Sequence, residues 1–217
     1  MATKNVISNK SSELTIDPGA SGDSFIQFDI NATGEFRIGV DDTDDSFRIS
    51  QGSSLGTNDT FVVSAAGEIT KPLQPAFLVI LTSNKNNVTG DGTTYTISWD
   101  SEIYDQGGDF ASNIFTAPIT AKYKFEGSVL IGGLTSSDTN GAFLFISSTR
   151  IYRCQQDFYN QRNASSEMSA YHTVYELMDA ADTMTMKIRV DGSAKVSDVL
   201  SSGATDPETW FSGNLEV

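Results

Sequence analysis

One segment of the sequence gathers side chains that could recognise a ligand. Between Thr149 and Asn163 lie two tyrosines, a phenylalanine, several amides and three of the four arginines found after residue 72. Rigid aromatic rings give contact area at a small entropic cost, while arginines and amides give directional hydrogen bonds. Sugars are bound in this way too, by stacking on rings and by hydrogen bonds to Asn, Asp and Arg. The segment therefore predicts a receptor-binding loop.

The candidate receptor-binding residues of this loop are Tyr152, Arg153, Asp157, Phe158, Tyr159, Asn160 and Arg162. The alternative interpretation is a hairpin in which Ile151 and Tyr152 belong to the core and the arginines balance carboxylates of a neighbouring subunit. Both interpretations stay open at the level of the sequence.

A second candidate site is acidic. Asp41, Asp42, Asp44 and Asp45 lie within five residues, and Ca²⁺ favours several carboxylate oxygens. The segment lacks the glycine at position six and the distal glutamate of an EF-hand loop. A solvated turn between Val40 and Phe47 is the alternative, and apart from this possible Ca²⁺ we expect no cofactor.

The residues offer little for catalysis. The sequence has one histidine, His172, and one cysteine, Cys154, and it has no Gly-x-Ser-x-Gly motif that would mark a nucleophile. His172 lies in an alternating segment, which favours a strand position at a surface or interface over a catalytic triad. A single cysteine forms no intramolecular disulfide and no multi-cysteine zinc site. We expect a protein that is not an enzyme.

The composition excludes further classes of protein. A formal net charge of −14 disfavours nucleic acid as a partner, because phosphate binding needs clustered Lys and Arg. The first ten residues lack the apolar core of a secretory signal, and no stretch approaches 18 apolar residues. We therefore expect neither export through a signal peptide nor insertion into a membrane. With 38% hydrophobic residues the chain can form a true core.

The chain is expected to divide at Lys71–Pro75, where two prolines within four residues favour an extended connector. Residues 1–71 repeat a short motif, in which Phe25, Phe36 and Phe47 begin segments 11 residues apart and Phe61 follows after 14. Alternating strands with Asn, Asp and Gly turns at this spacing predict β-hairpins. The segment has few core residues for its length, and three chains packed around one axis would bury the apolar side chains that one chain leaves exposed. We interpret residues 1–71 as a β-rich stalk or collar.

The pattern of residues 72–217 predicts a series of strands. Residues 119–131 alternate, with Tyr123, Phe125 and Val129 on one face and charged side chains on the other. Further strands are expected at residues 76–81, 95–99, 141–146, 170–178, 184–190 and 210–217. Seven or eight strands with polar connections predict an all-β fold, an antiparallel jelly-roll sandwich.

The motifs of this second part resemble those of the C1q/TNF-like head. Residues 113–125 read Asn-Ile-Phe-Thr-Ala-Pro-Ile-Thr-Ala-Lys-Tyr-Lys-Phe and resemble the family's F-T-A-P-x-x-G-x-Y-x-F signature, with Ala121 in place of the glycine. The end of the chain, Trp210-Phe-Ser-Gly-Asn-Leu215, resembles the closing F-S-G-x-L pattern. The resemblance implies a jelly-roll head that assembles as a homotrimer. It assigns core and trimer roles to Phe115, Tyr123, Phe125, Phe211, Gly213 and Leu215.

The stalk and the missing signal peptide favour a viral version of this head. The resemblance implies a fibre or spike protein of a virus, most simply a bacteriophage, made in the host cytoplasm and exposed on the virion. Its partners would be two further copies of itself, a host-surface receptor such as a glycan, and other virion proteins bound through the N-terminus. The alternatives are a purely structural decoration or plug protein of the particle, and a cellular C1q-like lectin or adhesion protein.

Overall fold

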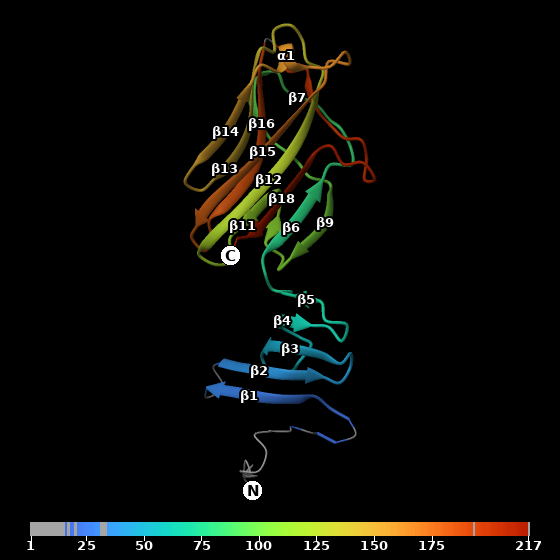
Figure 1. Ribbon diagram of the computed structural model, residues 1–217. Helices are drawn as coiled ribbons and strands as arrows, with labels where there is room; N and C mark the ends of the chain where they lie inside the picture. The colour runs from blue at the N-terminus through green and yellow to red at the C-terminus, as the bar shows by residue number, and fades with distance from the viewer. Residues whose placement is uncertain (1–15, 17, 20, 31–33, 193, 217) are drawn as a thin grey trace. The chain divides into compact units, whose positions relative to one another are not determined.

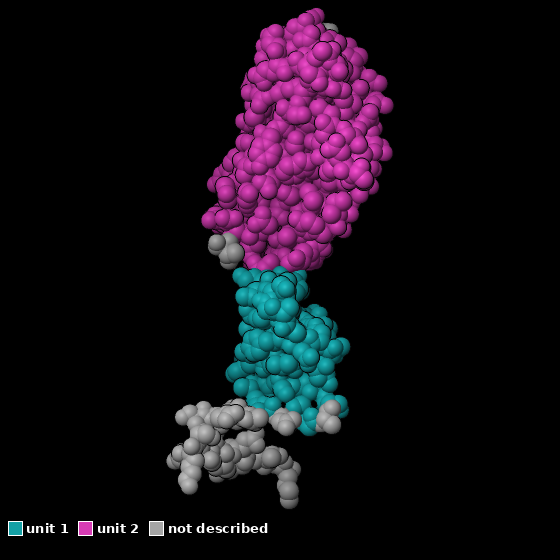
Figure 2. Space-filling model, turned by 45° about the vertical axis from the view of Figure 1, so that its right-hand side comes forward, with its two compact units in different colours: residues 1–73 teal, residues 74–217 magenta. Residues whose placement is uncertain are grey.

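A computed structural model describes residues 16, 18–19, 21–30, 34–192 and 194–216 of the 217-residue chain. The chain forms two compact units, residues 1–73 and residues 74–217, shown in different colours in Figure 2. The division lies inside the expected connector Lys71–Pro75, two residues beyond the expected end of the first part at residue 71. No helix in the described part of the chain is long and apolar enough to cross a membrane.

The first unit is a single antiparallel sheet. Its strands are β1 (Ser24–Ile30), β2 (Gly34–Asp41), β3 (Ser46–Gln51), β4 (Asp59–Val63) and β5 (Ile69–Thr70). They pair in the order of the chain, β1-β2-β3-β4-β5, as successive hairpins (Figure 1). The sequence repeat reflects this meander, since each repeated phenylalanine lies in a new strand.

The register of this sheet separates apolar from polar side chains. Paired residues project from the same face of a sheet, and neighbours along a strand project from opposite faces. One apolar row crosses the sheet as Ile26, Ile38, Ile49 and Phe61. A second row consists of Val40, Phe47, Val63 and Ile69, and a third begins with Phe28 opposite Phe36. We call these three rows the stalk face.

The second unit is a sandwich of two antiparallel sheets. Its elements are β6 (Ala76–Ile80), β7 (Lys85–Thr89), β8 (Asp91–Thr96), β9 (Ser101–Gln106), β10 (Phe110–Ala111), β11 (Ile114–Thr116), β12 (Ala121–Gly132), β13 (Asn140–Ser147), β14 (Ile151–Gln156), α1 (Phe158–Gln161), β15 (Met168–Met178), β16 (Thr183–Asp191), β17 (Ser197–Leu200) and β18 (Trp210–Leu215). One sheet has the order β10-β11-β16-β13-β14, and the other has β7-β17-β12-β18-β6-β9 with β15 paired to β12. This strand order confirms the predicted antiparallel jelly roll.

The core between the two sheets is aromatic. Along β12, Tyr123, Phe125 and Val129 are fully buried, as the alternation predicted, and the charged neighbours project outward. Phe211 of β18 packs edge-on to Phe77 of β6, with ring centroids 4.9 Å apart. A fully buried aromatic side chain removes more apolar surface from water than most aliphatic ones, so this cluster dominates the stability of the second unit.

Gly213 allows this packing because it has no side chain. A Cβ atom there would lie 2.6 Å from ring atoms of both Phe77 and Phe125. The missing side chain therefore makes room for two rings, which the pattern Phe211-Ser-Gly213 alone does not reveal.

Candidate functional site

The segment predicted as one loop contains a strand and a short helix. Strand β14 pairs antiparallel with β13, from Gly141 opposite Gln156 to Ile146 opposite Ile151, and forms one edge of its sheet. Helix α1 follows directly. The prediction of a loop over residues 149–163 was wrong at this point, because β14 has polar residues at most of its positions and so lacks an apolar alternation.

Strand β14 divides the predicted binding residues between its two faces. Arg153 is exposed, whereas Tyr152 and Cys154 are half-buried and pack against the core. Ile151, which the alternative interpretation placed in the core, is 60% exposed. Arg153 is therefore available to a ligand, whereas Tyr152 packs against the core.

A buried carboxylate fixes Tyr152 and the arginine next to it. Glu176 on β15 has a side chain that is 1% exposed, and it accepts hydrogen bonds from Tyr152 Oη and, at 2.8 Å, from Arg150 Nη1. The hydroxyls of Ser147 and Thr149 donate to Glu176 at 3.1 Å each. Burial alone would raise the pKa of Glu176, but these donors outweigh it and hold the pKa below its usual value. This network attaches β14 to β15 and leaves Tyr152 and Arg150 with structural partners.

Helix α1 is held at its N-terminal end by a cap and by a buried ring. Asp157 caps its N-terminus, accepting the backbone N–H of Asn160 at 3.1 Å and its side-chain amide at 2.6 Å. Phe158 is fully buried, and a Cβ at Gly141 would lie 2.3 Å from its ring. Phe158 therefore anchors the helix in the core and cannot touch a receptor, which corrects its place among the candidate binding residues.

Two candidate residues form one preorganised pair. The Arg162 guanidinium lies 3.7 Å over the centroid of the Tyr159 ring and also donates to the Tyr159 carbonyl oxygen. Cation–π stacking of this kind holds both side chains in one conformation. Both remain partly exposed, so the pair presents a rigid planar surface with a positive charge.

The two residues on either side of Arg162 in the sequence, Gln161 and Asn163, line a hollow in the surface. A cavity of about 520 Å³ is lined by Leu130, Gln156, Gln161, Asn163, Glu167, Met168, Ser169 and Glu208. We call it the amide hollow. The polar lining consists of amide, carboxylate and hydroxyl groups, the donors and acceptors that pair with the hydroxyls of a sugar.

Several groups of the amide hollow are fixed before any ligand arrives. Asn163 Oδ1 accepts the backbone N–H groups of Ser165 and Glu167 at 2.9 and 3.0 Å, and its amide donates to Glu167 Oε2 at 3.0 Å. Glu208 accepts a hydrogen bond from the Ser202 hydroxyl. The predicted segment supplies Gln156, Gln161 and Asn163, whereas Glu167, Ser169 and Glu208 were missed. Ser169 lies in β15, Glu167 in the turn before it and Glu208 in the connection before β18, and no sequence signal groups these three residues.

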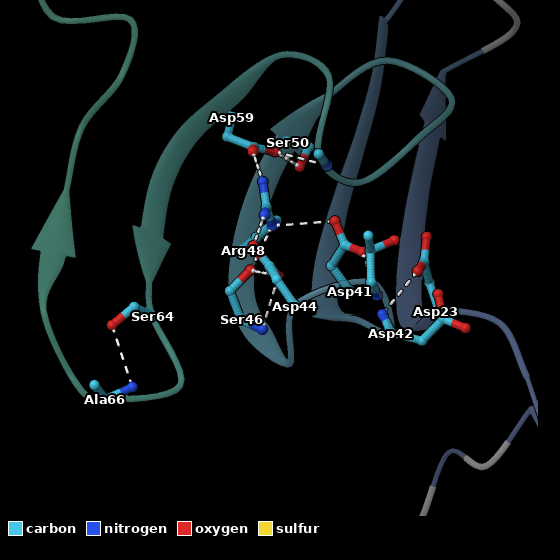
Figure 3. A network of polar contacts seen from close by, with 12 residues as sticks. Asp23, Asp41, Asp42, Asp44, Ser46, Arg48, Ser50, Asp59, Ser64 and Ala66 are labelled. Carbon is cyan, nitrogen blue, oxygen red and sulfur yellow. Dashed lines mark hydrogen bonds and ion pairs between the residues drawn. The ribbon is translucent and has the colours of Figure 1, made fainter.

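The acidic candidate site lies in the first unit, around an arginine. Arg48 projects among Asp41, Asp44 and Asp59, as Figure 3 shows, with its Nε 3.2 Å from Asp41 Oδ2. The pKa of Asp44 is lowered, chiefly by the hydrogen bond from the Ser46 hydroxyl. Asp42 instead accepts the backbone N–H of Gly22 at 2.7 Å, and Asp45 adopts a positive φ of 57° at the turn. Arg48 therefore already balances part of the negative charge of the acidic cluster that was predicted to bind Ca²⁺.

Asp23, Asp41 and Asp42 each place one carboxylate oxygen within 4.8 Å of the others. All three also have protein partners. Asp23 accepts the backbone N–H of Asp42 at 3.1 Å, and Asp41 accepts that of Thr43 at 2.9 Å. This trio is the part of the acidic segment that could hold a cation.

His172 and Cys154 are structural neighbours of the core. His172 stacks on Phe145 with ring centroids 5.6 Å apart, and its buried Nε2 has no hydrogen-bond partner. Burial lowers the pKa of His172, which favours the neutral ring. The Cys154 thiol is free and accepts a hydrogen bond from the Gln156 amide at 3.4 Å.

The residues that carry the family resemblance lie together. Phe115, Tyr123, Phe125, Phe211 and Gly213 are buried in one core, and Leu215 packs against it half-buried. The Tyr123 hydroxyl donates to the Ile119 carbonyl at 2.9 Å.

Solved structures similar to this chain include one zebrafish and one murine protein. The globular domain of zebrafish complement 1qA superposes with a TM-score of 0.45 and 16% identity, covering 66% of this chain and 98% of that domain. Murine APRIL at pH 8.0 gives a TM-score of 0.45 and 15% identity, over 66% of this chain and 99% of its own. No protein-family model matches the sequence, and no curated protein matches it either.

Proposed function

We propose that this chain is the outer part of a viral fibre or spike, that its second unit assembles as a homotrimeric head, and that the head binds a host-surface glycan. The amide hollow with the adjacent Tyr159–Arg162 pair is the observation that carries the proposal. A hydroxyl-rich ligand would find acceptors and donors in the hollow and a ring face beside it. No cofactor and no catalytic step are part of this function.

An exposed sheet face supports self-association of the head. On the outward side of the β9-β6-β18-β12-β15 sheet, Tyr104, Tyr175 and Leu177 are 48%, 53% and 68% exposed. A shallow hollow of about 370 Å³ lies on the same side, between Leu78, Tyr104 and Trp210. Apolar surface of this extent on a soluble protein marks an interaction site, and the family resemblance implies two further copies of the chain.

Three copies would make weak binding useful. Single sugar sites bind weakly, but three equivalent amide hollows on one trimer would act together when a cell surface offers many copies of the same glycan. The trimer would carry three times the charge of −14, which again disfavours nucleic acid as a partner. The first unit would join the head to other virion proteins, and the assembled protein would be located on the particle.

Binding should depend on the hollow and on the ring pair. The test uses the labelled full chain on an array of immobilised bacterial polysaccharides and eukaryotic glycans, and on the cells whose glycans score. We expect Tyr159→Ala/Arg162→Ala and Glu208→Gln each to lower binding at least tenfold. Arg189→Ala is the matched control, because this arginine pairs with Asp191 outside the hollow and its loss should leave binding unchanged.

Two results would contradict the proposal. Equal binding by the wild type and by the hollow variants would remove the amide hollow as the site. A protein that binds no glycan and no cell, but attaches saturably to virus particles, would support the structural decoration function instead.

A further inference from the structure

We propose that the stalk face is a self-association surface, on which three copies of the first unit pack their apolar rows against one another around a common axis. The proposal deepens the homotrimer of the proposed function, and it rests on a separate observation in the other unit of the chain. The occupant of the face is the same face of two further copies.

The stalk face is mostly apolar, with Ser24 and Gln51 at the ends of two rows, and much of it is exposed. Phe28 and Ile69 are 59% and 62% exposed, and Ile26, Phe36, Val40 and Phe47 are 39–44% exposed. Ile30, which projects to the same side of β1 as Phe28, is 70% exposed. A single sheet has only one layer, so nothing within its own five strands covers this side. Isolated sheets of this kind need a second apolar surface for stability.

The opposite face of the sheet is already satisfied. The Arg37 guanidinium stacks 4.2 Å from the centroid of Phe25 and donates to Gln27 at 3.0 Å. Arg48 pairs with Asp41, Asp44 and Asp59 on the same side (Figure 3). This polar face suits contact with water, which leaves the apolar face as the side that needs a partner.

The charges favour a copy of the same chain as that partner. The stalk face carries no charged side chain in its three described rows, although residues 1–71 contain 11 acidic against 5 basic residues. Three copies that meet through these rows therefore bring no like charges into contact and hold their acidic faces apart in water. If the copies met through their polar faces, aspartates of different copies would lie close together and repel one another.

The face is large enough to contribute to a trimer but too small to hold one alone. Five strands about 4.8 Å apart and about six residues of 3.3 Å each give a face of roughly 400 Å² per copy. In a ring of three copies, each pair of neighbours would share about that area in total, below the roughly 1,200 Å² of a stable interface. The stalk contact therefore adds to the contact between the heads.

The test exploits two neighbouring residues on opposite faces. In the full chain with Cys154→Ser, the variant Phe28→Cys places a thiol on the stalk face, and the matched control Gln27→Cys places one on the polar face. After mild oxidation we expect covalent dimers from Phe28→Cys on a denaturing gel, at least tenfold more than from Gln27→Cys. Light scattering of the unoxidised protein should give about 70 kDa, three times the 23.4 kDa chain.

A variant of the head separates the two parts of the trimer. Tyr171→Glu introduces a charge on the outward face of the β15 strand, where Tyr171 is 54% exposed. Cross-linking of Phe28→Cys that persists in this background would show that the stalk associates even when the head does not. Equal cross-linking of both cysteine variants would overturn the proposal, as would a 70 kDa protein in which neither cross-links. A monomer whose Phe28→Cys thiol resists maleimide would also overturn it, because another segment would then cover the face.

Discussion

The two units of this chain place the same kinds of side chain on strands with the same alternation, and they bury them to very different extents. In the second unit, Phe77, Phe125 and Phe211 are fully buried between two sheets. In the first unit, Phe28, Phe36 and Phe47 project from a single sheet and are 39–59% exposed. Phenylalanine and isoleucine alone therefore do not determine a core, because the number of layers decides whether they are covered.

The difference implies two sources of stability. The second unit closes its core within one chain, so most of its free energy of unfolding should come from contacts inside that chain. The first unit has one satisfied face and one open face, so its stability should rise when copies associate. Substitutions that act on only one unit can test this division.

The largest effect is expected at Phe211. Its ring packs against Phe77, and its removal in Phe211→Ala leaves a cavity in the closed core that should cost about 3–5 kcal/mol. Both tryptophans, Trp99 and Trp210, lie in the second unit, so tryptophan fluorescence during urea unfolding reports that unit alone.

The matched control for this prediction is Phe28→Ala, the same change on the open sheet. We expect it to leave the tryptophan transition within about 0.5 kcal/mol of the wild type, since it removes no contact in the second unit. Equal losses at Phe28 and Phe211 would show that the two units unfold as one, against the division argued above.

The next effect concerns the polar face of the first unit. Arg48 pairs with Asp41 and Asp59, whose side chains are 8% and 7% exposed. Arg48→Met keeps most of the volume but leaves two buried carboxylates without their cation, at a cost of about 3–5 kcal/mol. Hydrogen exchange of the amides in β2, β3 and β4 should therefore accelerate strongly, while the tryptophan transition stays unchanged.

Arg37→Met is the matched control on the same face. Arg37 forms its ion pair with the more exposed Glu35, at 3.4 Å, and otherwise stacks on Phe25 and donates to Gln27, so its loss leaves no buried carboxylate unpaired and should cost less than the loss of Arg48. We also expect EDTA to leave the hydrogen exchange rates of the wild type unchanged, because Arg48 and not a metal ion balances the charge of the acidic cluster. Slower exchange on adding Ca²⁺ to the wild type would favour the cation site at Asp23, Asp41 and Asp42 instead.

The sequence predicts the strands whose apolar residues report a buried face. Strands β6, β12, β13, β15, β16 and β18 coincide with predicted segments, because β12, β15, β16 and β18 bury every second residue and β6 and β13 are apolar along most of their length. Strands β7, β9, β10, β11 and β17 were not predicted, and the strand expected at residues 95–99 overlaps β8 at two residues only. Strand β14 was foreseen only in the alternative interpretation, as part of a hairpin. Strands β7 and β14 lie at sheet edges, where Lys85-Asn-Asn and Arg153-Cys-Gln-Gln supply hydrogen bonds to the sheet but little apolar pattern.

The candidate site was predictable only in part, for a related reason. Tyr159, Arg162 and Asn163 are neighbours in sequence, so their composition identifies them. Ser169 joins the amide hollow because the register of β12 and β15 places it opposite Leu130. Such pairings depend on which strands meet and at which residue, and that information is spread over the whole sheet.

The smallest effect comes from the buried carboxylate of the second unit, the counterpart of Arg48 in the first. There one arginine is surrounded by acids, whereas Glu176 is one acid surrounded by three hydroxyls and an exposed arginine. Glu176→Gln keeps the shape but removes the charge that these donors stabilise. We expect a loss of about 1–3 kcal/mol near neutral pH, measured by tryptophan fluorescence in urea.

The pH dependence distinguishes this charge from a mere change in packing. The folded state lowers the pKa of Glu176 below its unfolded value of about 4.3. Its contribution is therefore fully present above about pH 5 and is lost as the pH falls through the lower pKa of the folded state. The difference in free energy of unfolding between the wild type and Glu176→Gln should narrow below about pH 4.

The control Glu126→Gln, at a half-exposed pair with Lys124, should differ from the wild type by less than about 1 kcal/mol. A gap for Glu176→Gln that is independent of pH would mean that shape, and not charge, attaches β14 to β15.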